Sequence, residues 1–222
     1  MSDLCYLGFD ECIGNCSQDP IIIAMAVSRN PEEISQNLRL PKRRDLDQKV
    51  LERNFLYTVI EKDSLYHHRN MHATIEELVF AGINKFCNYD DLLELYFDGS
   101  LSNFDHERKL LRHPQFKFES VTFVRSGDEK LRLLNIADHI ANIVYCYLSN
   151  SPISKRRVNA FRLNYSRLDE VLSQSKIVVP MPKTYISQYL QYDRDRTFIP
   201  ERPLFKRVRS NNKKCTQHKD YA

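Results

Sequence analysis

The sequence predicts an α/β fold in which helices pack against a mixed β-sheet. Apolar and β-branched runs typical of strands fill much of the first 60 residues, and the apolar spacing changes to a helical period after residue 70. Strand-like and helix-like segments then alternate up to residue 148, which favours a layered α/β domain. With 222 residues, 42% hydrophobic and 28% charged, the composition is globular. It excludes collagenous, low-complexity and wholly disordered proteins.

Three strands are expected in the first part of the chain. Residues 4–10, 20–27 and 55–60 are apolar runs of strand length, and the second is rich in isoleucine. Residues 31–38 predict a brief helix between the second and third strands. Asn30 would be its N-cap, because a proline follows at the first helical position.

The helical period begins with residues 71–86, which predict an amphipathic helix. Residues 92–97 fit either a strand or a further helical turn, and residues 118–124 alternate as a strand does. A Ser-Gly-Asp break at 126–128 then precedes a helix predicted at residues 129–148.

Charge divides the chain into parts. Residues 1–150 hold 17 Lys and Arg against 23 Asp and Glu, a net charge of −6, and residues 151–222 hold 16 against 6, a net charge of +10. We therefore expect one α/β domain over residues 1–150 and a basic aromatic extension over 151–204 that packs on or beside it. Residues 205–222 are expected to form a disordered basic tail.

The extension interleaves cations with aromatic side chains. Cations neutralise phosphates and aromatic rings stack on unpaired bases, so this pattern favours nucleic-acid binding, with a merely solvated basic surface as the alternative. The candidate binding residues are Arg156, Arg157, Phe161, Arg162 and Tyr165.

Several classes of protein and site are disfavoured. No apolar run reaches the ~18 residues that span a bilayer, and the first residues do not resemble a secretory signal, so a cytoplasmic protein without a membrane partner is expected. Six scattered cysteines are then expected to be reduced thiols. Cys12 and Cys16 have a spacing that could begin a zinc site, but no second pair follows.

Four acids stand out as candidates for chemistry. Asp10 and Glu11 end the first predicted strand, and Asp98 ends the run at 92–97. On a helical wheel of the last predicted helix, the apolar face consists of Leu133, Ala137, Ile140, Val144 and Leu148, and the polar face of Arg132, Asn135, His139, Asn142 and Cys146. Asp138 lies between the two faces, among leucine and alanine positions. A carboxylate in such surroundings must be paired, protonated or bound to a cation. A buried salt bridge or a helix-capping contact is the alternative.

The order of these acids along the chain can bring them together at one edge of a mixed sheet. Mg²⁺ and Mn²⁺ prefer oxygen ligands, and a pair of such ions can clamp the attacking and leaving oxygens of a phosphodiester. The pattern therefore predicts a site with two Mg²⁺ or Mn²⁺ ions.

Three short motifs carry a resemblance to a known family. Gly8-Phe9-Asp10-Glu11, with a glycine at position 14, resembles the opening strand of type 2 ribonucleases H, and Phe97-Asp98-Gly99 resembles the aspartate-bearing strand of that family. The stretch at 135–141 is similar to an Ala-Asp-x-Ile-Ala helix of uncharacterised ribonuclease H-like proteins from mobile or defence regions.

This resemblance covers residues 4–148. It implies a ribonuclease H-like fold, a five-stranded mixed sheet flanked by helices with an acidic two-metal site. Where type 2 ribonucleases H carry Gly-Arg-Gly, which reads a ribose hydroxyl, this chain has Ile13-Gly14-Asn15 without the arginine.

The function expected from the sequence is a metal-dependent nuclease. Asp10, Asp98 and Asp138 would hold the metal ions and Glu11 would assist, with RNA and DNA both open as substrates and the oligomeric state undefined. The alternatives are a catalytically silent nucleic-acid-binding module and an interaction protein of a mobile element or defence system.

Overall fold

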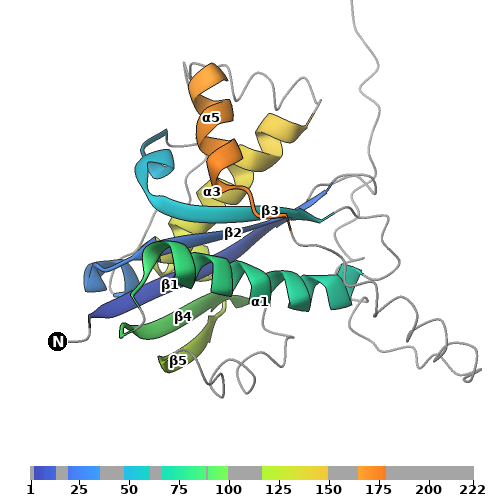
Figure 1. The fold of residues 1–222 in the computed structure, drawn as a ribbon. Helices are drawn as coiled ribbons and strands as arrows, with labels where there is room; N and C mark the ends of the chain where they lie inside the picture. Colours follow the sequence, from blue (N-terminus) through green and yellow to red (C-terminus); the bar gives the residue numbers. More distant parts are fainter. Residues whose placement is uncertain are drawn as a thin grey trace, which may run out of the picture. The chain divides into compact units, whose positions relative to one another are not determined.

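Five strands form one mixed sheet in the computed structural model (Figure 1), in the order β3-β2-β1-β4-β5. The structure describes residues 3–13, 20–35, 48–60, 67–88, 90–99, 117–149 and 165–178. Its strands are β1 (Leu4–Ile13), β2 (Ile21–Ser28), β3 (Asn54–Ile60), β4 (Leu92–Asp98) and β5 (Lys117–Val124). β2 pairs antiparallel with β1 and β3, whereas β4 pairs parallel with β1 and β5.

Helices cover both faces of this sheet. α1 (His67–Phe86) packs on one face, and α3 (Arg132–Leu148) packs on the other, where α5 (Tyr165–Ser175) joins it (Figure 1). The described residues also contain the short 3-10 helices η1 (Pro31–Ile34), η2 (Gln48–Glu52) and η4 (Gly127–Glu129). The predicted fold class, a mixed five-stranded sheet flanked by helices, is confirmed.

The alternation of β1 sends its side chains into two separate cores. Cys5, Leu7 and Phe9 are buried in the cluster that includes the inner side of α1. Tyr6 belongs to the cluster beneath α3, and Gly8 lies directly against that helix. Successive strand residues face opposite sides, so Asp10 follows Tyr6 and Gly8 toward α3.

Several predicted elements differ from the observed ones, and α1 begins at His67, ahead of the predicted start at residue 71. β1 continues past Asp10 to Ile13, because its outer residues still pair with β2 up to Ile13↔Ile21. Residues 92–98 are a strand and not a helical turn. The last predicted helix begins at Arg132, since residues 127–129 form η4 instead.

The expected polar face of α3 is wrong at three of its five positions. Asn135, His139 and Cys146 are buried, whereas Leu148, expected on the apolar face, is 41% exposed at the helix end. Besides the sheet, α3 contacts η1, η2 and η4, so more of its surface is covered than packing on the sheet alone would cover. A buried polar group there needs a partner, and the side chain of Asn135 donates a hydrogen bond to the backbone carbonyl of Asp128 at 3.1 Å.

The described part of the basic extension is attached to the domain. Leu168 and Leu172 of α5 are buried in the cluster beneath α3, and the hydroxyl of Tyr147 in α3 donates to Asp169 at 2.6 Å. Residue 177 donates its backbone amide to the carbonyl of Tyr57 in β3 at 2.8 Å. The boundaries expected at residues 150 and 204 stay predictions.

In the described part of the chain, no helix combines the length and the apolar character that a bilayer crossing requires.

Candidate carboxylate site

The site lies where β1 and β4 separate. Their parallel pairing ends at Phe9↔Phe97, whose rings stack with centroids 4.6 Å apart, and an aspartate follows each phenylalanine. Because Phe9 and Phe97 both face α1, Asp10 and Asp98 both start on the opposite face of the sheet, under α3. The pairing register therefore brings two carboxylates that are 88 positions apart to one edge of the sheet.

α3 brings the third acid to this edge. Leu133 packs on Gly8 so closely that a methyl group on Gly8 would lie 2.7 Å from the Leu133 Cγ atom. Asp138 follows about one and a half turns later on the same helix. The side-chain amide of Asn142 donates to Oδ1 of Asp138 at 2.7 Å and to its backbone carbonyl at 2.9 Å. Asn142 thereby fixes the direction of the Asp138 carboxylate.

Asp10 is the most buried of the four candidate acids, at 5% exposure. Burial raises its pKa well above the ordinary range of an aspartate, and the negative charges of Glu11, Asp138 and Asp98 raise it further. The Glu11 backbone amide lowers the pKa of Asp10, because it donates a hydrogen bond to Asp10 Oδ1 at 2.7 Å. Each of the charged groups that shift this pKa is a carboxylate. Three chain segments thus bring acids close enough to act on Asp10.

A glycine that sequence analysis treated as a turn signal orients Asp98. The backbone amide of Gly127 donates to Oδ1 of Asp98, and a side chain at this position would collide with Leu134 of α3, 2.2 Å away. Ser126 before it has the left-handed φ of 52°. The Ser-Gly pair directly ahead of the Asp138 helix was the available signal for this role, but its hydrogen bond to Asp98 depends on tertiary structure.

Glu11 starts from the other face of the strand. It pairs with Ile23 of the cluster beside α1, whereas Asp10 pairs with Ala24 of the cluster beneath α3. The strand does not end at Glu11, so the two side chains cannot start from the same face. The Glu11 side chain is partly buried and its Oε2 atom is shielded from solvent. Its charge nevertheless reaches Asp10.

The donor set suits a hard divalent cation in charge and chemistry. It consists of carboxylates, the ligands that Mg²⁺ and Mn²⁺ prefer, and a dication would relieve the repulsion around buried Asp10. Among the described residues, however, no three His, Cys, Asp or Glu side chains are placed to hold a metal ion as they stand. Repulsion between their like charges favours a separation of these carboxyl groups. The carboxyl groups would therefore have to move toward one another when a cation binds.

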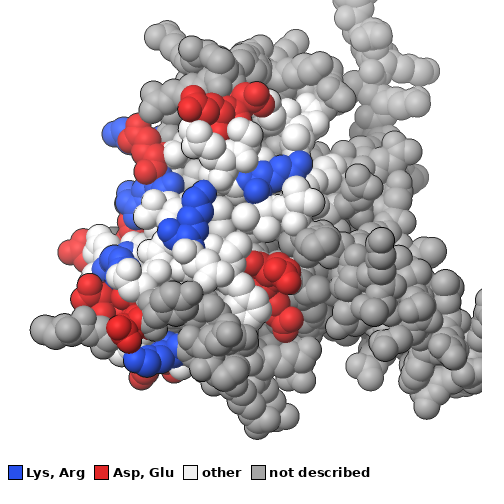
Figure 2. Space-filling model, in the orientation of Figure 1, with Lys and Arg blue, Asp and Glu red and all other residues white. Residues whose placement is uncertain are grey.

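The structure does not test the predicted nucleic-acid-binding residues. Arg156, Arg157, Phe161 and Arg162 are outside the described residues, and Tyr165 is described only as the first residue of α5. On the face seen in Figure 2, described basic and acidic side chains are interspersed. The nucleic-acid-binding role of Arg156, Arg157, Phe161, Arg162 and Tyr165 stays a prediction.

The sequence matches no family model, and no curated protein matches it. The structure is similar to a mutant of Bst-RNase HIII and to Bst-RNase HIII in complex with Mn²⁺. Each has a TM-score of 0.46 and 15% identity, over 66% of this chain and 53% of the other. The chain thus spans about half the length of these two chains. The ribonuclease H2 from Pyrococcus horikoshii OT3 has a TM-score of 0.40 and 16% identity, over 86% of this chain and 89% of the other.

Proposed function

We propose that this protein is a metal-dependent nuclease that hydrolyses phosphodiester bonds in RNA or DNA. The observation that supports the proposal is the environment of Asp10, a buried carboxylate on which the charges of Glu11, Asp98 and Asp138 act. Gathering like charges around a buried acid destabilises a fold, so such an arrangement indicates a functional site.

Asp10, Asp98 and Asp138 would hold the metal, with Glu11 assisting from the neighbouring position. Bound divalent ions supply a water of lowered pKa and charge stabilisation for the leaving oxygen. The chain's own contribution is orientation. Asn142 fixes Asp138 and the Gly127 amide fixes Asp98, while the burial of Asp10 keeps water from screening its attraction for a dication.

Substrate binding would require positive charge, because bare carboxylates repel phosphates. The net charge of +10 in residues 151–222 supplies it. In this proposal Arg156, Arg157 and Arg162 contact the phosphate backbone, and Phe161 and Tyr165 stack on unpaired bases.

A catalytically silent binding module is the less suitable interpretation. Such a protein would gain nothing from acids clustered around Asp10, which repel nucleic acid. Melting curves with and without Mn²⁺ distinguish the two. A metal-binding site raises the melting temperature by mass action, by an amount equivalent to about 2.7 kcal/mol at 100 times the Kd, whereas a silent module gives no shift.

The Asp138→Asn variant tests the nuclease assignment. It keeps the shape of the side chain and the hydrogen-bonding capacity toward Asn142 but removes a charge that would hold metal. We expect cleavage of RNA or DNA in Mg²⁺ or Mn²⁺ to fall by at least about 100-fold, equivalent to about 2.7 kcal/mol, with folding retained.

Asp90→Asn is the matched control, because the Asp90 side chain is 91% exposed and pairs with Lys117 at the surface. It should cleave at the wild-type rate. An Asp138→Asn protein that cleaves as fast as Asp90→Asn would contradict the proposal, as would wild-type protein that cleaves equally well in EDTA.

A further inference from the structure

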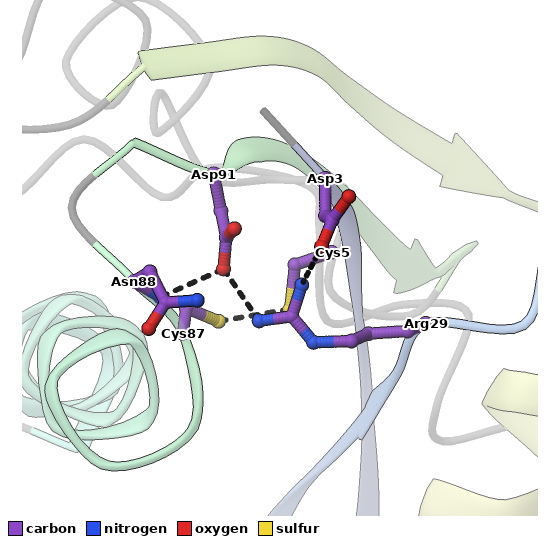
Figure 3. A network of polar contacts seen from close by, with 6 residues as sticks. All are labelled: Asp3, Cys5, Arg29, Cys87, Asn88 and Asp91. Carbon is purple, nitrogen blue, oxygen red and sulfur yellow. Dashed lines mark hydrogen bonds and ion pairs between the residues drawn. The ribbon is translucent and has the colours of Figure 1, made fainter. Parts of the chain in front are cut away.

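Two cysteines far apart in sequence meet at the end of β1 remote from Asp10. The sulfur atoms of Cys5 and Cys87 are 2.8 Å apart, although the residues are separated by 82 positions (Figure 3). Cys5 lies in β1 and is fully buried, whereas Cys87 directly follows the last residue of α1 and is partly exposed. A disulfide requires about 2.05 Å between sulfurs, so closing the bond needs a movement of about 0.8 Å.

Ion pairs and hydrogen bonds hold the backbone segments on either side of this pair. Asp91 is buried and accepts from the guanidinium of Arg29 at 2.6 Å and from the backbone amide of Asn88 at 2.7 Å (Figure 3). Arg29 also lies 3.9 Å from Asp3. Asn88 is the residue after Cys87, and Asp3 is two residues before Cys5. The two sulfurs are therefore kept together by fixed main-chain segments.

The same network favours a reactive thiolate. The hydrogen bond from Cys87 lowers the pKa of Cys5 and the positive charge of Arg29 lowers it further, against the opposing effects of burial and of the negative charge of Asp91. The hydrogen bond raises the pKa of Cys87 correspondingly. The thiolate is therefore favoured on Cys5. Either sulfur can be the donor in this contact, so a proton passed from Cys87 to Cys5 would place the negative charge on the more accessible sulfur.

We propose that Cys5 and Cys87 form a reversible disulfide when the protein meets a low-molecular-weight disulfide such as oxidised glutathione. This modification site is independent of the proposed nuclease. Cys5 precedes Asp10 by five residues, about 17 Å along a strand, and faces the opposite side of the sheet.

The exchange proceeds in two balanced steps. Once the proton of Cys87 has passed to Cys5 across their contact, the partly exposed Cys87 sulfur attacks one sulfur of oxidised glutathione as a thiolate and expels a glutathione thiolate. The sulfur of Cys5 then attacks the Cys87 sulfur in this mixed disulfide and expels the second glutathione. The two expelled thiolates take up the two protons given up by the cysteines. Two cysteine thiols are oxidised and one glutathione disulfide is reduced to two thiols.

The bond would fasten the first strand of the sheet to the end of α1. Because it closes a loop of more than 80 residues, it restricts the unfolded chain strongly. We expect the oxidised protein to melt about 5 to 10 °C higher than the reduced protein, a shift that dithiothreitol reverses.

The experiment treats the full chain with graded ratios of oxidised to reduced glutathione and then blocks the remaining thiols with iodoacetamide. Peptide mapping by mass spectrometry without reduction should detect a Cys5–Cys87 cross-link in the wild-type protein. Cys87→Ser should lose both the cross-link and the redox-dependent melting shift. Cys146→Ala, which removes a different buried cysteine, should keep both.

The mapping of the wild-type protein decides the question even if a variant fails to fold. Full alkylation of Cys5 and Cys87 after exposure to oxidised glutathione alone would overturn the proposal. Cross-links that join other cysteines in place of this pair would also overturn it.

Discussion

Gly8 of β1 lies against Leu133 of α3 with no room for a side chain between them: a methyl group there would sit 2.7 Å from Leu133 Cγ and 3.3 Å from its carbonyl carbon. This contact sets the height of α3 above the sheet. Asp10 extends from the same strand and Asp138 from the same helix, so the contact also sets how far apart these two acids lie.

Gly8→Ala should therefore separate α3 from β1. The backbone and the branched side chain of Leu133 leave no space for the added methyl group. We therefore expect the unfolding free energy to fall by about 1 to 3 kcal/mol. A weaker Mn²⁺-induced melting shift should accompany it. Urea unfolding and melting curves in Mn²⁺ measure the two effects.

Gly82→Ala in α1 is the matched control on the opposite face. Its methyl group would meet the flexible end of Met25, and alanine is the better helix former by about 1 kcal/mol. The Mn²⁺ shift should stay at the wild-type value. If both variants lost that shift equally, the Gly8 contact would have no special link to the carboxylates.

The charge of Asp10 should make stability depend on pH. Its pKa is raised by burial and by neighbouring acids, so the folded state retains a proton at pH values where the unfolded chain has lost it. The unfolding free energy should then fall as the pH rises from about 4 through the folded pKa. The Asp10→Asn substitution removes this loss of unfolding free energy at high pH, because asparagine does not ionise. In metal-free buffer at pH 7 it should be more stable than wild type by about 1 kcal/mol.

Urea unfolding at pH 4, 5.5, 7 and 8 measures this effect. The advantage of Asp10→Asn over wild type should shrink toward zero near pH 4, while Asp90→Asn, an exposed control, should show no such trend. An Asp10→Asn protein that is less stable than wild type at pH 7 and equal at pH 4 would show that the ionised carboxylate is stabilised, contrary to the account.

Asn142 should support Asp138 as a positioning residue. Asn142→Ala removes the 2.7 Å hydrogen bond to the carboxylate, which should lower the unfolding free energy by about 1 kcal/mol. The Mn²⁺ affinity should fall several-fold. A double-mutant cycle with Asp138→Asn measures the coupling. Strictly additive effects on Mn²⁺ affinity would exclude the positioning role.

The sheet could be predicted because its strands are locally distinctive. Runs such as Ile21-Ile22-Ile23 suit buried strand positions wherever they occur, and the odd surroundings of Asp138 on its helix marked it without any structure. The C-terminal end of β1 could not be predicted, because Cys12 and Ile13 extend the strand through their pairing with β2.

Features that depend on contacts between segments distant in the sequence could not be predicted either. The helical wheel put His139 on a polar face, whereas it is buried in a helix that contacts η1, η2 and η4 as well as the sheet. The roles of Gly8 and Gly127 depend on which side chains of α3 meet them. The meeting of Cys5 and Cys87 follows from the docking of α1 on the sheet, which no local pattern encodes.

Anomalous diffraction from crystals of the protein grown with Mn²⁺ is the decisive experiment on the carboxylate site, because it locates the metal independently of activity. We expect two Mn²⁺ peaks about 4 Å apart, bound by carboxylate oxygens of Asp10, Asp98 and Asp138 that have moved together around them. No peak at these carboxylates in Mn²⁺-saturated crystals, or a lysine or arginine side chain in its place, would contradict the account.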